Sequence, residues 1–151
     1  NTQAIAQAKE IGVSQVTLSV EDTKINICKL IENSPLETNL IIYQDVPLFT
    51  SVGCIRDNDC QTCSHQDKWF NMTQNGHKYK ALSRDCQMML FDANPYCIVE
   101  EAKNLQPYLF RMDFCYCEYS PEKVANIVNK ILLFKNATDC NIKGNFQNAN
   151  I

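Results

Sequence analysis

The sequence predicts an α/β fold that carries a cysteine-rich insert. Two stretches show apolar residues at helical spacing that alternate with short, continuously apolar runs, as in α/β proteins. A polar segment with several of the nine cysteines separates the two stretches. With 151 residues, of which 45% are apolar and 21% charged, the composition is that of one ordinary globular domain spanning residues 1–151.

The stretch before the insert predicts two helices and two strands in alternation. Apolar spacing, a helix-ending glycine and capping residues define them. The predicted elements are a helix over 4–11 that ends at Gly12, a strand over Val13–Val20, a helix that begins after Asp22 or Thr23 and ends near Asn33, and a strand over Leu40–Tyr43.

The insert, residues 50–86, begins as a polar loop and ends in a β-hairpin. Asn75-Gly76 is the dipeptide that a type I′ turn prefers, and aromatic and β-forming residues flank it from Trp69 to Ser83. The βα rhythm then resumes. The expected elements are a strand over Met88–Phe91, a short helix over Ile98–Leu105, a strand over Tyr108–Phe114 and a helix capped by Ser120 with Pro121.

Four parallel strands with interleaved helices make about half of an eight-stranded barrel. We therefore predict the C-terminal half of a TIM-like β/α barrel with a cysteine-rich loop and β-hairpin insert. The inner faces of its strands, including Leu18 and Ile42, would lack packing. The predicted partner is the N-terminal half of the barrel, in the same or a separate polypeptide, or a second chain in a dimer.

Three cysteines within ten polar loop residues, Cys54, Cys60 and Cys63, predict a metal site. Cys86 can return to them through the hairpin. Four sulfur ligands select zinc or an iron–sulfur cluster, and the spacing alone does not choose between them. A redox disulfide is the alternative for the loop cysteines.

The other candidate ligands have simpler interpretations. Cys28 and Cys97 fit core packing, and burial is also the preferred reading of Cys115 and Cys117. His65 is a candidate zinc ligand, although loop histidines are more often solvated. An odd cysteine count, no visible signal peptide and no apolar run long enough to span a bilayer favour a reduced, cytoplasmic compartment.

Little in the sequence points to hydrolysis or to broad nucleic-acid binding. No G-x-S-x-G or H-E-x-x-H motif occurs, and the net charge of −3 offers no basic excess. Asp45, Asp92 and Asp113 each fall near the C-terminal end of a predicted strand, where barrel enzymes place their chemistry, or they cap helices. Arg111, in an apolar strand, would need an anion or carboxylate partner.

The succession of these motifs resembles the collagenase-like U-32 peptidase family. The matching segments, in order, are Leu18-Ser19-Val20-Glu21, the cysteines Cys54, Cys60, Cys63 and Cys86 around the hairpin with Gly76, Met89–Pro95, Arg111–Phe114, Ser120-Pro121-Glu122 and Lys143–Phe146. The sequence departs from the family pattern at Thr73-Gln74, at Asp92-Ala93 and at Asn145, which predicts altered or absent catalysis.

The resemblance implies a cofactor, a chemistry and substrate-binding residues. Some members of the family, understood differently from the peptidase label, carry a four-iron four-sulfur cluster on four cysteines and act in hydroxylation of RNA bases or of quinone precursors. The implied ligands here are Cys54, Cys60, Cys63 and Cys86, and the implied substrate-binding residues are Glu21, Asp92, Arg111 and Asp113. Peptidase activity, as the family label says, and a non-catalytic zinc module are the alternatives.

Overall fold

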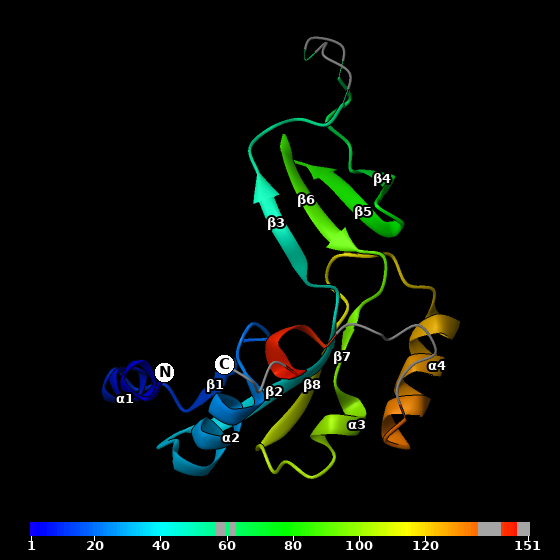
Figure 1. Ribbon diagram of the computed structural model, residues 1–151. Helices are drawn as coiled ribbons and strands as arrows, with labels where there is room; N and C mark the ends of the chain where they lie inside the picture. Colours follow the sequence, from blue (N-terminus) through cyan, green and yellow to red (C-terminus); the bar gives the residue numbers. More distant parts are fainter. Residues whose placement is uncertain (57–59, 61–62, 136–142, 148–151) are drawn as a thin grey trace. The chain divides into compact units, whose positions relative to one another are not determined.

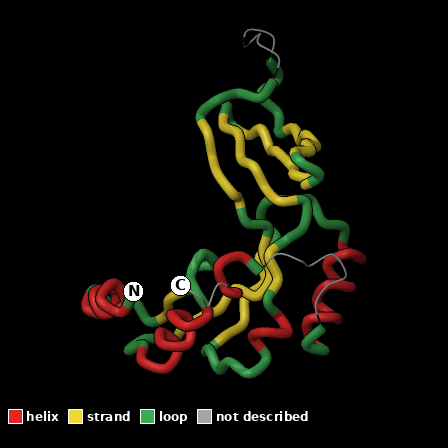
Figure 2. The backbone as a smooth tube through the Cα atoms, in the orientation of Figure 1, coloured by secondary structure: helices red, strands yellow, loops and turns green. Residues whose placement is uncertain are grey.

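The computed structural model describes residues 1–56, 60, 63–135 and 143–147, and the chain divides into two compact units (Figure 1). Unit 1 combines Asn1–Gln44 with Pro95–Ile151, and unit 2 is Asp45–Asn94. Unit 2 contains the predicted insert, residues 50–86. All described helices belong to unit 1, whereas the described part of unit 2 is built from strands and loops (Figure 2).

The sheet of unit 1 is organised around one strand, β2 (Glu37–Gln44). β1 (Gln15–Thr17) and β8 (Leu109–Asp113) pair with β2 in parallel, and the short β7 (Tyr96–Cys97) pairs with it antiparallel. Tyr43 is paired with both Cys97 and Met112, so β7 and β8 lie on opposite edges of β2. The C-terminal ends of the three parallel strands therefore share one end of the sheet.

The α2 and α4 helices of unit 1 begin after the caps that the sequence predicts, whereas the first helix begins two residues earlier than expected. Side chains of Asn1, Thr23 and Ser120 cap α1 (Thr2–Glu10), α2 (Lys24–Asn33) and α4 (Pro121–Leu132). Gly12, at a φ of 91°, follows the end of α1, where a left-handed residue closes a helix. The α3 helix (Val99–Ala102) is shorter than expected, and a 3₁₀ turn (Gly144–Gln147) follows near the C-terminus.

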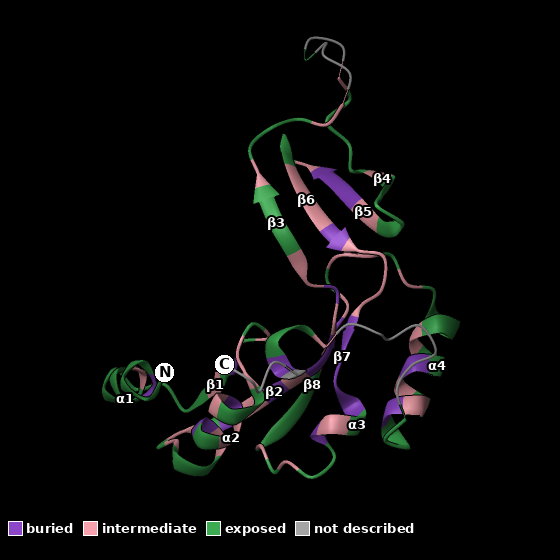
Figure 3. Ribbon diagram, viewed as in Figure 1, coloured by how far each residue is buried: buried purple, intermediate pink, exposed green. Residues whose placement is uncertain are grey.

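Apolar side chains from distant parts of the chain form the core of unit 1. The buried residues include Ile27 and Leu30 of α2, Leu40 and Tyr43 of β2, Ile98 and Val99 beside α3, and Phe146 (Figure 3). The segment around Phe146 is further held by Lys143, which pairs with Glu101, and by Asn145, whose Nδ2 donates to the carbonyl of Glu21 over 2.9 Å. The C-terminal segment thus belongs to the core of this unit.

Unit 2 is a four-stranded antiparallel sheet in the order β3-β6-β5-β4. Its strands are β3 (Pro47–Ser51), β4 (Lys68–Gln74), β5 (His77–Arg84) and β6 (Gln87–Asp92). Ala81, Leu82 and Phe91 are buried, and the rings of Trp69 and Phe91 lie 5.6 Å apart. Two-residue turns join β4 to β5 and β5 to β6.

The predicted half barrel is wrong. The described residues form no four-stranded parallel sheet, and four of the six strand pairings are antiparallel. Met88–Phe91, the predicted third barrel strand, is part of β6 and pairs antiparallel with β5 and β3. The reason is local, because a two-residue turn at Asp85-Cys86 can only reverse the chain, whereas a parallel strand needs a long crossover.

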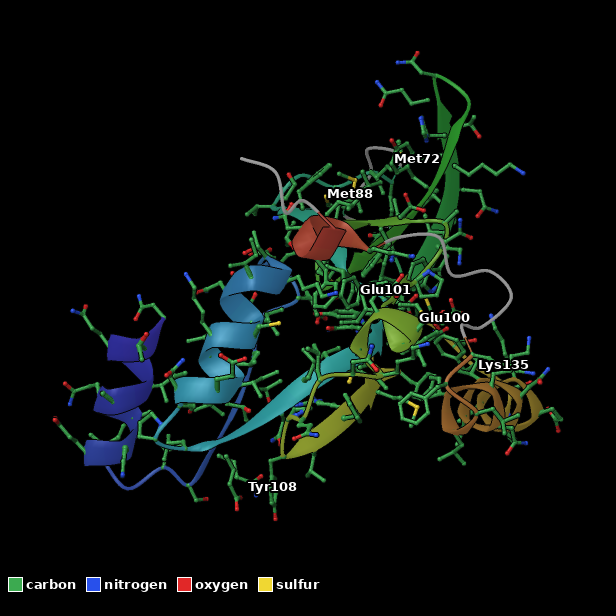
Figure 4. The ribbon with its side chains drawn as sticks, turned by 60° about the horizontal axis from the view of Figure 1, so that its bottom comes forward. Met72, Met88, Glu100, Glu101, Tyr108 and Lys135 are labelled. Atoms are coloured by element: carbon green, nitrogen blue, oxygen red, sulfur yellow. The ribbon has the colours of Figure 1, made fainter. Side chains whose placement is uncertain are left out.

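The expected lack of packing at Leu18 and Ile42 is also wrong, because both are buried in the structure. In the sheet of unit 1, the exposed apolar residues lie instead on β8 and just before it: Tyr108, Leu109 and Phe110. Figure 4 shows Tyr108 directed away from the ribbon. Among the described helices, none has the length and apolar character needed to cross a bilayer.

Candidate metal centre

Three of the four predicted metal ligands line one small cavity in unit 2. The cavity has a volume of about 10 Å³, and its walls are the side chains of Cys54, Arg56, Cys63, His65, Ser83 and Cys86. We call it the thiol cavity. A volume of this size holds about one water-sized sphere. The lining of the cavity therefore includes three cysteines and one histidine.

The elements of unit 2 explain why these side chains meet. Cys54 follows β3, Cys63 and His65 precede β4, and Cys86 lies in the turn between β5 and β6. In the order β3-β6-β5-β4, these positions fall at the same end of the sheet. The antiparallel meander, rather than the spacing in the sequence, gathers the thiols.

Cys86 adopts a backbone conformation that cysteine rarely takes. The turn residues Asp85 and Cys86 have φ values of 49° and 59°, as a type I′ turn requires at both positions. Glycine is favoured at the second position, and a left-handed non-glycine residue costs roughly 1–2 kcal/mol. A strained residue that contributes a thiol to a cavity points to a functional demand at this position.

Arg56 contacts two of the thiols. Its Nη1 donates to Cys63 Sγ over 3.5 Å, and its backbone N–H donates to Cys54 Sγ over 3.4 Å. The guanidinium group is held by Ser83, whose Oγ accepts from Nε over 2.9 Å. Positive charge and hydrogen-bond donors beside sulfur favour the thiolate form, which is the form that binds metals.

The electrostatics of Cys63 follow from these neighbours. A hydrogen bond from the backbone of His65, followed by the hydrogen bond and charge of Arg56, holds the pKa of the Cys63 thiol below its usual range. The positive charge of Lys68 acts in the same direction. Cys63 is therefore more often a thiolate at neutral pH than an ordinary cysteine.

The fourth position of the site is less defined than the first three. Cys60 is exposed and does not line the thiol cavity. His65 does line it, and its Nδ1 lies 3.5 Å from Cys86 Sγ. In the part of the chain that the structure describes, no three His, Cys, Asp or Glu side chains are already spaced as metal ligands.

The remaining described cysteines belong to unit 1 and are differently placed. Cys97 is fully buried and Cys28 is partly buried on α2. Cys115 is exposed beside Asp113, and hydrogen bonding and charge from that carboxylate raise the pKa of the Cys115 thiol. No disulfide joins any of the eight described cysteines.

Two of the four predicted substrate-binding residues lie together. Arg111 Nη2 and Asp113 Oδ2 are 3.1 Å apart at the end of β8. Hydrogen bonds from Cys115, and then the charge of Arg111, hold the pKa of the Asp113 carboxyl below its usual range. Arg111 thus has a carboxylate partner, but its side chain is half exposed rather than buried as the apolar strand suggested.

The other two substrate-binding candidates are at separate positions. Glu21 is exposed in the turn between β1 and α2. Asp92 ends β6 in unit 2, and its Oδ1 accepts from the backbone N–H of Asn94 over 3.0 Å. Within unit 1, Glu21 and Asp113 follow parallel strands and so share one end of that sheet.

The sequence reasoning missed two residues of the thiol cavity, Arg56 and Ser83. An arginine two positions after Cys54 was a usable signal, because guanidinium groups commonly accompany thiolates. Ser83 gave no signal, since its role depends on strand pairing.

No family model, no curated protein and no solved structure matches the chain.

Proposed function

We propose that unit 2 binds a metal centre through the thiols of Cys54, Cys63 and Cys86. The observation that carries the proposal is that these three thiols line one cavity with an arginine beside them. The donor set fits a soft or borderline metal, since thiolates and imidazole select zinc and iron–sulfur clusters. The strained backbone of Cys86 supports a ligand role, because the left-handed conformation by itself would favour glycine at this position.

The first candidate is an iron–sulfur cluster with Cys60 as the fourth ligand. The order of the cysteine, hairpin and strand motifs that resembles the U-32 family supports it. A bound cluster would supply electron transfer for hydroxylation-type chemistry on RNA or a small aromatic substrate. The half-exposed Arg111 beside the ionised Asp113 supports a role for these two residues in binding that substrate. Thiols without disulfides support a cytoplasmic location.

The second candidate is a single zinc ion with His65 as the fourth ligand. Tetrahedral zinc with bonds of about 2.3 Å to sulfur and about 2.0 Å to nitrogen places the two ligand atoms roughly 3.6 Å apart. The separation of Cys86 Sγ and His65 Nδ1 is 3.5 Å. The size of the thiol cavity also suits one ion, whereas a cluster needs the loop to open.

Metal analysis of two matched variants separates the candidates. The protein would be purified without oxygen, and iron, sulfide, zinc and visible absorbance would be measured for wild type, Cys60→Ser and His65→Ala. An iron–sulfur centre on four cysteines predicts brown protein that Cys60→Ser bleaches and His65→Ala leaves intact. A zinc site predicts colourless protein, in which Cys60→Ser leaves the zinc content intact and His65→Ala lowers it. Wild-type protein that takes up neither metal nor cluster after reconstitution would refute the proposal.

A further inference from the structure

The guanidinium group of Arg56 connects the segment that follows β3 to the sheet of unit 2. Nε donates to Ser83 Oγ over 2.9 Å, and Nη2 donates to the Ser83 carbonyl over 3.1 Å and to the carbonyl of Gln66. Ser83 lies in β5, one of the two inner strands of the sheet, and Gln66 precedes β4. One side chain therefore joins the segment after β3 to β5 and to the segment that carries Cys63 and His65.

Ser83 is a firm anchor for this arrangement. It is 2% exposed, and it is paired with Lys68 on β4 and with Met88 on β6. A buried hydroxyl requires a hydrogen-bond partner, and Arg56 provides it. The hydroxyl and the guanidinium group thus fix each other, which leaves little freedom in the direction of the remaining donors.

Those remaining donors are directed at sulfur. Nη1 of Arg56 donates to Cys63 Sγ, and the backbone N–H of Arg56 donates to Cys54 Sγ. An arginine keeps its charge at any physiological pH, and its planar fork can hold protein anchors on one side while it donates on another. A lysine has a single ammonium group and cannot reproduce this geometry.

We infer that Arg56 is the positioning residue of the metal centre, which sets the affinity of the site and, for a redox centre, its potential. The inference rests on the proposed function. A metal held by three or four thiolates leaves net negative charge in the site, and a fixed cation with donors to sulfur offsets it. Groups that hydrogen-bond to metal ligands commonly change metal affinity and the potential of iron–sulfur centres.

The test compares Arg56→Gln and Arg56→Lys with Arg84→Gln as a matched control. Arg84 belongs to the same unit, and its Nε pairs with Asp67 over 2.7 Å. It does not line the thiol cavity. The metal that wild type takes up would be competed away with a chelator of known affinity. Arg56→Gln should bind it about 10–100-fold more weakly, the usual loss for an outer-shell substitution. Arg56→Lys should fall between, and Arg84→Gln should match wild type.

Two further measurements exclude a purely structural effect. If the centre is iron–sulfur, Arg56→Gln should shift its reduction potential to more negative values, because a positive charge and a donor to sulfur are removed. Ser83→Ala keeps the charge but releases one anchor, so it should weaken binding less than Arg56→Gln. Thermal melting of the metal-free variants tests whether each is folded. If Arg56→Gln does not fold, Ser83→Ala still tests the inference.

The outcomes separate the inference from the proposed function. Wild-type protein that binds no metal overturns both. Wild-type protein that binds metal, with folded Arg56→Gln and Ser83→Ala of equal affinity and unchanged potential, overturns the inference alone. Weaker binding in Arg84→Gln equal to that in Arg56→Gln would also overturn it, because any nearby positive charge would then suffice. A graded loss confined to Arg56 and Ser83 supports it.

Discussion

Two cysteines, Cys63 in unit 2 and Cys115 in unit 1, lie in opposite electrostatic surroundings. In unit 2, Cys63 lies beside Arg56 and Lys68, and its pKa is lowered. In unit 1, Cys115 lies beside Asp113, and its pKa is raised. The neighbouring charges therefore favour the thiolate form of Cys63 and the thiol form of Cys115. The sign of the neighbouring charge therefore distinguishes these two cysteines, which the sequence alone does not.

The backbone shows the same contrast within one sheet. The turn at Asn75-Gly76 uses the preferred residues for two positive φ values, 52° and 81°. The turn at Asp85-Cys86 uses the same geometry with a cysteine where glycine would be unstrained. The second turn places a cysteine in the lining of the thiol cavity, whereas neither residue of the first turn lines it.

Replacing a cysteine that lines the thiol cavity of unit 2 should abolish or greatly weaken metal binding. Replacing a cysteine of unit 1 should leave the metal binding of unit 2 unchanged. Cys63→Ser removes a thiolate from the thiol cavity and should lower metal affinity by about 100-fold or more, because the hydroxyl is a poor ligand for these metals. Cys115→Ser is the matched control and should retain full stoichiometry. Metal content after reconstitution measures both. Equal loss in the two variants would contradict the division between the units.

Cys97→Ser should instead lower the stability of the fold. Cys97 is fully buried in unit 1, and burying a hydroxyl in place of a thiol should cost about 1–3 kcal/mol of the free energy of unfolding. Chemical denaturation of the metal-free protein measures this. Cys54→Ser, at an exposed position, should change stability by less than about 0.5 kcal/mol. A neutral Cys97→Ser would show that its surroundings tolerate a polar atom.

Cys86→Gly should stabilise the metal-free protein while it removes a ligand. Relief of the left-handed strain, less the added freedom of glycine in the unfolded chain, should raise the free energy of unfolding by about 0.5–1 kcal/mol. Gly76→Ala, at a φ of 81°, should lower it by about 1 kcal/mol. Denaturation of both variants without metal is the measurement. A destabilised Cys86→Gly would mean that the thiol itself holds the turn together.

The reactivity of single thiols should differ between the units. In metal-free protein at neutral pH, Cys63 should be alkylated several-fold faster than Cys115, because a lowered pKa leaves more thiolate and a raised pKa leaves less. The difference should shrink as the pH rises well above the usual thiol pKa of about 8.5. Mass spectrometry of a timed alkylation series gives both rates. Faster labelling of Cys115 would reverse the electrostatic assignment.

Local signals in the sequence predicted most of the elements. The caps at Thr23 and Ser120 and the hairpin at Asn75-Gly76 were predicted correctly, because each depends on residues within one turn of the chain. The β3 strand (Pro47–Ser51) was missed, because it has no continuous apolar pattern and depends on pairing with β6. The turn at Asp85-Cys86 was missed because it lacks the glycine that identifies such turns.

The sequence by itself determined which side chains are available: thiols concentrated between residues 54 and 86, and helices with their caps. Only the tertiary structure decided which of them meet. Strand order in unit 2 brings Cys54, Cys63 and Cys86 to one cavity with Arg56 and buries the Ser83 anchor, and a strained turn reverses the chain where a parallel strand was expected. The physical reason is that capping and turn preferences act over a few neighbouring residues, whereas strand pairing joins residues far apart in sequence.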